Sequence, residues 1–192
     1  METKQLDATM AATRDDGLAP VRTALQRVET VLRRRPDMGL HDDAPATVRW
    51  SAGTRVVARH ANGTQIPTDM PTELGGAGDR VTPGWLFRAG LASCAATCIA
   101  MKAAADSVAL STLEVQARSR SDTRGLLAMA DEHGAEVYAG PVDMSLTVRI
   151  GAAGVAADDL RALVEAALRC SAIPVAVRNA TPVALSIVVD GA

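Results

Sequence analysis

The segment from residue 82 to residue 106 most constrains the fold, because it is apolar on nearly every side of a helix. Thr82 is a helix-capping residue type and Pro83 suits the first helical position, so a helix is expected to begin here. Its middle is mostly Ala, Gly, Leu, Ser, Cys, Ile and Met, which predicts burial on most faces. The uncharged run between Arg88 and Lys102 has 13 residues, fewer than the ~20 that cross a bilayer. The pattern therefore predicts a buried central helix and no membrane.

The rest of the chain alternates between helical and strand-like patterns. Apolar residues recur at helical spacing from Val21 to Leu32, whereas apolar and polar residues alternate over 142–150. The expected elements, in chain order, are a helix over 18–35, strands over 47–50, 54–59 and 64–66, the helix over 82–106, strands over 113–121 and 142–150, a helix over 158–169 and a strand over 183–189. This order indicates an α+β chain with antiparallel sheets. Residues 1–46 are expected to be a polar lead-in and an amphipathic helix, and residues 47–192 the main domain.

Composition excludes some classes of partner and favours a compartment. The formal net charge is −2, and the chain has two Trp, one Tyr and one Phe. It therefore has neither the basic surface nor the stacking side chains that nucleic-acid binding needs, so no nucleic acid is expected. The first residues are polar and acidic, so no signal peptide is expected. A cytoplasmic location follows, where the thiols of three cysteines stay reduced.

Two cysteines stand at positions that a fold can hold in place. Cys94 lies within the expected central helix, and Cys170, 76 residues later, lies at the end of the next long helix. Two positioned thiols can carry out thiol–disulfide or peroxide chemistry. Cys94 and Cys98 could instead be small core residues, and this is the favoured interpretation for Cys98. No histidine lies at ligand spacing to the cysteines, so no metal site is expected.

Four motifs support a resemblance to a known family. The most specific is Pro83 followed by Leu86 and then Ala92-Ser93-Cys94, and the second is Cys170 in a Cys-Ser-x-x-Pro setting. The other two motifs are Leu74-Gly75-Gly76 and Ser121-Asp122-x-Arg124-Gly125. With these motifs, residues 47–190 resemble the OsmC/Ohr family of osmotically inducible and organic hydroperoxide resistance proteins.

The resemblance implies a fold, an assembly and a site. It implies an OsmC-like fold with antiparallel sheets around a long buried central helix, in an intertwined homodimer with active sites at the subunit interface. It implies that Cys94 is the reactive and Cys170 the resolving cysteine, with no bound cofactor and an external dithiol as reductant. Arg55 best matches the arginine that activates the thiolate in this family, with Arg49 and Arg59 as the next candidates.

One position departs from the family pattern. Peroxidase members carry a glutamate just after the Pro, and here that position is Gly84. The nearest acids, Glu73 and Asp79, lie in the preceding glycine-rich loop. Cys94 lies about ten residues into its helix, beyond the reach of the helix dipole, so a nearby cation is expected to lower the pKa of its thiol.

Further residues near Cys94 have two interpretations each. Trp85 and Phe87 could line an apolar substrate mouth or anchor a dimer core. Arg88 could form a salt bridge or be a second cation near the site. Asp122 and Arg124 are expected to stabilise a turn.

The predicted function is thiol-dependent reduction of organic hydroperoxides, weak because of Gly84. The alternative is a non-peroxidatic dimer that binds a small hydrophobic or thiol ligand at its interface, with Gly84 marking the lost activity. A third possibility is a structural role in assembly through the N-terminal helix.

Overall fold

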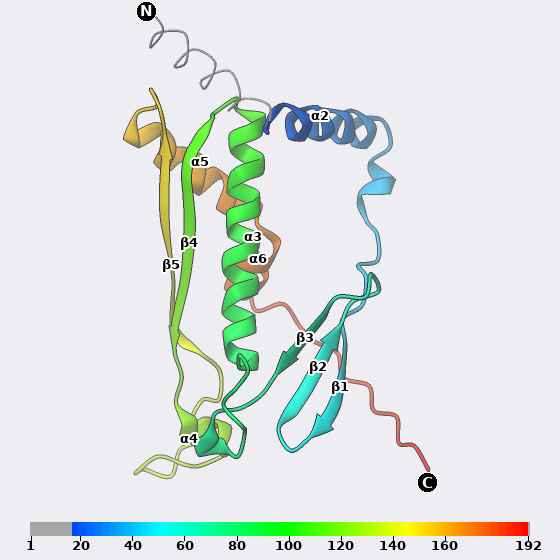
Figure 1. Ribbon diagram of the computed structural model, residues 1–192, viewed down its shortest axis with the longest axis vertical. Helices are drawn as coiled ribbons and strands as arrows, with labels where there is room; N and C mark the ends of the chain where they lie inside the picture. Colours follow the sequence, from blue (N-terminus) through cyan, green and yellow to red (C-terminus); the bar gives the residue numbers. More distant parts are fainter. Residues whose placement is uncertain (1–16, 192) are drawn as a thin grey trace, which may run out of the picture.

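The computed structural model describes residues 17–191 as helices packed on one long two-stranded sheet, with a second sheet to one side (Figure 1). Of the polar lead-in expected over residues 1–17, residues 1–16 lie outside the described residues. The elements are α2 (Ala19–Arg34), a 3-10 turn (Pro36–Gly39), β1 (Thr47–Ala52), β2 (Arg55–Arg59), β3 (Gln65–Thr68), a 3-10 turn (Thr72–Leu74), α3 (Pro83–Ala105), β4 (Leu110–Arg120), α4 (Thr123–Leu126), β5 (Val142–Ala152), α5 (Ala157–Arg169) and α6 (Ala172–Arg178). The prediction of an α+β chain with antiparallel sheets is confirmed.

The central helix α3 begins and ends where its local signals place it. The hydroxyl of Thr82 accepts a hydrogen bond from the backbone N–H of Trp85 at 3.1 Å, and Pro83 fills the first helical position. At the other end, Lys102 pairs with Asp106 over 2.6 Å, which places a cation in the last turn. By length and composition alone α3 is also long and apolar enough to cross a membrane, but the core helices of soluble proteins share these two properties. In this fold α3 packs against β4, α5, α2 and α6, so it is the central helix of the molecule.

Two separate antiparallel sheets flank this helix. β2 pairs with β1 on one side and β3 on the other, and a turn with Gly53 at φ +54° joins β1 to β2. β4 and β5 each contain 11 residues and form a long ribbon. The strands expected over 113–121 and 142–150 are confirmed, with bounds shifted by a few residues.

The core lies between α3, α5 and the β4–β5 ribbon. Ile99 and Ala103 of α3 meet Leu163 and Ala167 of α5, and all four side chains are buried. Half-buried apolar residues of the ribbon close the cluster: Leu110, Leu113, Val115, Val148 and Ile150. The inward residues of each strand alternate with exposed polar ones, as a sheet with one covered face requires.

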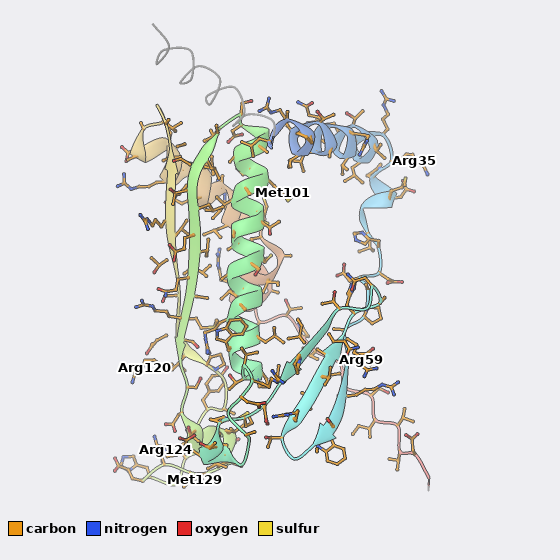
Figure 2. The ribbon with its side chains drawn as sticks, in the orientation of Figure 1. Arg35, Arg59, Met101, Arg120, Arg124 and Met129 are labelled. Atoms are coloured by element: carbon orange, nitrogen blue, oxygen red, sulfur yellow. The ribbon has the colours of Figure 1, made fainter. Side chains whose placement is uncertain are left out.

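The prediction that α3 is buried on most faces is wrong for the single chain. Its buried residues form one stripe, at Leu91, Ala95, Ile99, Ala103 and Ala104. On other faces apolar side chains remain open, with Trp85 50% and Met101 39% exposed. Met101 faces a groove below α2 (Figure 2). The reason is spatial, because β4, α5 and α6 lie against one side of α3 and the β1–β3 sheet extends away from it (Figure 1).

The strand expected over 183–189 is also wrong for the single chain. Within the described part of the chain these residues pair with no strand, and Val183 is 93% and Leu185 85% exposed. Their alternation of apolar and polar residues is typical of a strand, but a strand forms only where an edge is free to pair with it. The chain instead forms the short helix α6 before this segment, which the sequence pattern did not indicate.

The region between β4 and β5 contains a capped turn. The carboxylate of Asp122 accepts a hydrogen bond from the backbone N–H of Arg124 at 3.0 Å and pairs with its guanidinium at 2.6 Å. These contacts begin the single helical turn α4. They support the interpretation of Asp122 and Arg124 as turn-stabilising residues.

Candidate functional site

The sulfur of Cys94 lies against the start of α6. The hydroxyl of Ser171 donates to Cys94 Sγ at 3.2 Å, and the backbone N–H of Ile173 donates to the same atom at 3.5 Å. Cys94 belongs to the middle of α3 and is partly buried. Two segments 77 residues apart in sequence therefore meet at this sulfur.

Ser171 is the closest polar partner of the thiol and was missed by the sequence analysis. It occupies the residue before the first turn of α6, where a serine hydroxyl ordinarily accepts a backbone N–H of its own helix. Here its hydroxyl is directed to Cys94, and the residue is 0% exposed. Pro174, also buried, has no N–H to offer in this turn. The signal was present in the Cys-Ser-x-x-Pro motif, but it was assigned to the preceding cysteine.

The pKa of the Cys94 thiol lies below its ordinary value. Burial, the largest single influence, raises this pKa, because it disfavours the charged thiolate. The hydrogen bonds from Ser171, Ile173, Cys98 and the Ala172 backbone together outweigh it and lower the pKa. A nearby cation was expected in this role from the position of Cys94 in its helix. Within residues 17–191 of one chain, hydroxyl, thiol and backbone donors fill it instead.

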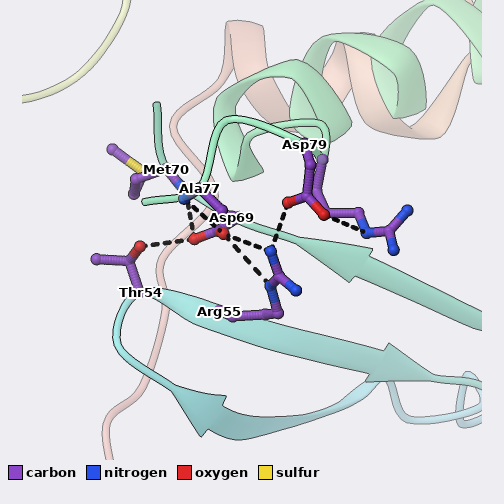
Figure 3. A network of polar contacts seen from close by, with 7 residues as sticks. Thr54, Arg55, Asp69, Met70, Ala77 and Asp79 are labelled. Atoms are coloured by element: carbon purple, nitrogen blue, oxygen red, sulfur yellow. Dashed lines mark hydrogen bonds and ion pairs between the residues drawn. The ribbon is translucent and has the colours of Figure 1, made fainter. Parts of the chain in front are cut away.

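Arg55 lies in a separate polar network between the β1–β2 turn and the loop before α3 (Figure 3). Its guanidinium pairs with Asp69 at 3.0 Å and with Asp79. Asp69 also accepts hydrogen bonds from Thr54 at 2.6 Å and from the Ala77 backbone at 3.1 Å. This network brings Arg55 to two carboxylates of its own chain, and no contact with Cys94 is present among the described residues.

The same network gives Arg55 two carboxylate partners, Asp69 and Asp79. Hydrogen bonds from Thr54, the Ala77 backbone and Arg55 hold the pKa of the buried Asp69 well below its usual range, so this carboxylate is ionised. Asp79, one of the two acids identified from the sequence, contacts Arg55, whereas Glu73 contacts Thr72. The other candidate arginines, Arg49 and Arg59, are exposed on the strands β1 and β2.

Cys170 faces a different part of the molecule from Cys94. It is exposed at the end of α5, where its backbone N–H bonds to the carbonyl of Ala167 at 3.1 Å. A groove of about 1040 Å³ runs between α2, α3 and α5, and Cys98, Met101 and Cys170 contribute to its lining. All three cysteines are free thiols. The structure therefore places Ser171, and not its neighbour Cys170, against Cys94.

Phe87 lines a groove beside the partners of Cys94. This groove of about 690 Å³ is lined by Tyr138, Met144, Ile173 and Val177 together with Phe87. Phe87 is 40% exposed, as expected for a side chain that lines the opening of an apolar groove. Trp85, also named as a substrate candidate, is half-exposed on the first turn of α3.

Arg88 and Gly84 lie side by side at the start of α3. The guanidinium of Arg88 donates to the hydroxyl of Ser119 on β4 at 3.3 Å. A Cβ atom added at Gly84 would lie 3.7 Å from Nη1 of Arg88. A side chain at position 84 would therefore meet Arg88 before any other cation. Among residues 17–191, no cluster of three or more His, Cys, Asp or Glu is arranged to hold a metal ion.

Comparison with known proteins agrees with this architecture. A family model described as OsmC-like protein matches residues 76–186, more than half of the chain. No curated protein sequence matches the chain significantly.

Solved structures with a similar fold each cover nearly three quarters of the chain. A Mycoplasma pneumoniae OsmC-like protein superposes with a TM-score of 0.59 at 14% identity, covering 72% of this chain and 89% of its own. Organic hydroperoxide resistance proteins from Legionella pneumophila and Elizabethkingia anophelis each superpose with a TM-score of 0.53 at 20% identity. The Legionella match covers 72% of this chain and 91% of its own, and the Elizabethkingia match 73% and 91%. At these identities the likeness concerns the fold.

Proposed function

The chain belongs to the family of OsmC-like proteins, and we propose that it reduces organic hydroperoxides to alcohols with Cys94 as the reactive thiol. The observation that carries the proposal is the set of hydrogen bonds from Ser171 and Ile173 to Cys94 Sγ. Donors directed at a sulfur stabilise the thiolate over the thiol, and the thiolate is the form that attacks peroxides. Two of the structural neighbours are named organic hydroperoxide resistance proteins, which supports the choice of substrate class.

The first step joins sulfur to oxygen. The Cys94 thiolate attacks the distal oxygen of the hydroperoxide, the O–O bond breaks, and the alkoxide leaves with a proton as the alcohol. Cys94 becomes a sulfenic acid, oxidised by two electrons. Two thiol equivalents then return these electrons, with release of water and formation of a disulfide. An external dithiol is the reductant expected from the sequence, which assigned the resolving role to Cys170.

The groove lined by Phe87 and Ile173 is the proposed place for the organic part of the substrate. Its lining is apolar, it has a volume of about 690 Å³, and it adjoins the residues that contact Cys94. Such a groove favours an alkyl or aryl hydroperoxide over hydrogen peroxide, because apolar surface is removed from water on binding. The same groove is what favours the alternative function, binding of a small hydrophobic molecule without turnover.

The role proposed for Arg55 requires a second copy of the chain. In one chain Arg55 is held by Asp69 and Asp79 on the arm that carries β1–β3, which extends away from α3 (Figure 1). In an intertwined homodimer this arm would lie over the partner's α3, and Arg55 would complete the site there. The carboxylates of Asp69 and Asp79 would orient the guanidinium, as the glutamate does in the peroxidase pattern.

The test is thiol-dependent consumption of cumene hydroperoxide. We expect turnover by the unaltered protein and loss to the uncatalysed rate in Cys94→Ser. Cys98→Ser is the matched control, because it removes a second thiol of α3 but keeps a hydrogen-bond donor at position 98, and it is expected to stay active. Equal rates for the protein and Cys94→Ser would overturn the proposal. If all forms are inactive and a hydrophobic molecule is retained through purification, the binding function is supported instead.

A further inference from the structure

The oxidised form of Cys94 needs a second thiol, and the chain has two that could serve. The first is Cys98, which lies one turn further along α3 and helps to lower the pKa of the Cys94 thiol. In a helix, residues four apart have Cβ atoms about 5–6 Å apart, whereas a disulfide needs about 3.5–4.5 Å. A Cys94–Cys98 bridge would therefore require α3 to be distorted where Ala95 and Ile99 are fully buried.

The second thiol, Cys170, is separated from Cys94 by Ser171. Ser171 is 0% exposed and its hydroxyl is in contact with Cys94 Sγ, so it occupies the place a resolving sulfur would need. Cys170 is exposed and lines the groove that also contains Cys98 and Met101. For the Cys170 sulfur to reach Cys94, Ser171 would have to leave its buried site. The α5–α6 junction that holds it is packed on both sides, with Ala167 and Pro174 buried.

We propose, on the basis of the hydroperoxide activity proposed above, that Ser171 is a positioning residue for Cys94 and that an external thiol reduces the Cys94 sulfenic acid directly. The external thiol attacks the sulfenic sulfur, water leaves, and a mixed disulfide joins Cys94 to the reductant. A second thiol group of the reductant then attacks this disulfide, which releases the Cys94 thiol and leaves the reductant as a disulfide. The sum is one hydroperoxide and two thiols giving one alcohol, one water and one disulfide.

The surroundings of Cys94 are open enough for this attack. Ser93 and Thr97, which flank Cys94 on α3, are exposed, as are Ala172 and Ile173 on the facing turn. The groove beside Ile173 and Phe87 gives an incoming molecule a path to this surface. A thiol from solution therefore meets the sulfur without the rearrangement that Cys170 requires.

The first experiment tests the geometry without any peroxide. Diamide, which joins thiols that are close together, is applied to the protein, to Ser171→Cys and to Cys170→Ser, and disulfides are mapped by mass spectrometry of peptides. We expect a rapid intramolecular bridge between Cys94 and position 171 in Ser171→Cys and none between Cys94 and Cys170 in the unaltered protein. A rapid Cys94–Cys170 bridge in the unaltered protein overturns the inference, and so does failure of folded Ser171→Cys to form its bridge.

The second experiment follows the oxidised sulfur. After one equivalent of cumene hydroperoxide, we expect dimedone to label Cys94 equally in the unaltered protein and in Cys170→Ser, and labelling to be lost in Ser171→Cys. Conversion of the unaltered protein to a Cys94–Cys170 disulfide contradicts the inference. If Cys94 is not oxidised at all, the proposed function fails. The diamide result still shows whether position 171 or Cys170 can reach the Cys94 sulfur.

A third measurement separates positioning from a merely structural role of Ser171. The rate of Cys94 alkylation by iodoacetamide is recorded against pH for the protein and for Ser171→Ala. Loss of the hydroxyl donor is expected to shift the profile to higher pH, with circular dichroism unchanged. An unchanged profile in folded Ser171→Ala overturns the positioning role.

Discussion

At the scale of single residues, the reactivity of Cys94 depends on neutral donors more than on a cation of its own chain. Ser171 and the Ile173 backbone hold the sulfur, while Arg55, the arginine that best matches the family pattern, is held by two carboxylates elsewhere. A neutral donor stabilises a thiolate less than a cationic donor does, because the cation adds the attraction between opposite charges. Cys94 is therefore expected to be moderately acidic by itself and to become more so if Arg55 of a second chain approaches.

This difference can be measured by alkylation. We expect Cys94 to react with iodoacetamide at pH 6–7 faster than Cys98, because hydrogen bonds lower the pKa of the Cys94 thiol. Arg55→Ala is expected to slow both this reaction and hydroperoxide turnover, since Arg55 would act on the thiolate across the dimer interface. Arg59→Ala, on the same strand, is the control. An unaltered rate in Arg55→Ala would show that the neutral donors act alone.

Asp69 is expected to make the arm sensitive to acid. Hydrogen bonds from Thr54 and the Ala77 backbone, with a further one from Arg55, keep the pKa of Asp69 below its unfolded value of about 3.9. A carboxylate whose pKa is lowered by folding contributes stability that is fully present above about pH 5. This stability is lost as the pH falls toward and through the pKa that the group has in the folded protein. Asp69→Asn should therefore lower the Tm most at neutral pH, and the difference from the unaltered protein should shrink below about pH 4.

The control for Asp69 is a carboxylate on the surface. Asp143 pairs with Arg120 in an exposed ion pair, so Asp143→Asn should change the Tm little at any pH. Thermal unfolding followed by circular dichroism between pH 3 and 8, at one protein concentration, makes the comparison. A Tm difference for Asp69→Asn that does not depend on pH would contradict the assignment.

At the scale of elements, the first turns of α3 and α6 position the residues that meet at the Cys94 sulfur. α3 begins at a Thr82 cap with Pro83, which sets the rotation of the helix and hence the side on which Cys94 lies. α6 begins with Ser171, whose hydroxyl is directed to that sulfur. Gly84 lies in the first turn of α3 next to Arg88, so a substitution there tests the helix start and the site together.

Gly84→Glu is expected to stabilise the fold without raising hydroperoxide turnover. Glutamate is a better helix former than glycine and can pair with Arg88 four residues on, together about 1 kcal/mol. Arg55 already has Asp69 and Asp79 as partners, so a further carboxylate is not needed to orient it. Gly84→Gln keeps the helix propensity without the charge and should give about half of the gain. Denaturant unfolding and the peroxide assay measure both effects, and a large rise in turnover would assign the orienting role to position 84.

At the scale of the whole molecule, exposed apolar surface is the reason why we predict a homodimer. The segment over 183–189 alternates apolar and polar residues, and Val183, Leu185 and Ile187 are 75–93% exposed. Every residue of β1 is exposed, and α3 has an open apolar side. Surfaces of this kind are typical of chains that complete their core by association. An intertwined homodimer would cover them and would let residues 183–189 pair as a strand.

The assembly prediction is a dimer at micromolar concentration. Light scattering should give twice the chain mass of 19.9 kDa. Leu185→Asp with Ile187→Asp should shift the protein to monomer, because charges would be placed on the apolar side of the pairing segment, whereas Ser186→Asp lies on the opposite side and should not. A monomeric mass for the unaltered protein would remove the dimer, and with it the proposed role of Arg55.

The sequence by itself determined the elements whose signals are local. Thr82 and Pro83 place the start of α3, alternation predicts β4 and β5, and the apolar face with Leu160 and Leu163 predicts α5. These features depend on residues a few positions apart, so a linear pattern contains them. The same holds for the position of Cys94 within a helix, which identified the candidate reactive thiol.

Only the tertiary structure decided which residue meets Cys94 and which residues meet Arg55. Ser171 and Cys170 are adjacent in sequence, and the turn between α5 and α6 directs one to the sulfur and the other to a separate groove. The partner of Cys94 lies 77 residues away, and those of Arg55 lie 14 and 24 residues away. A linear pattern reports spacing along the chain, whereas a hydrogen bond depends on distance in space, which packing of α3 against α5 and α6 sets. For the same reason the exposure of α3 and of residues 183–189 depends on which surfaces the fold brings against them.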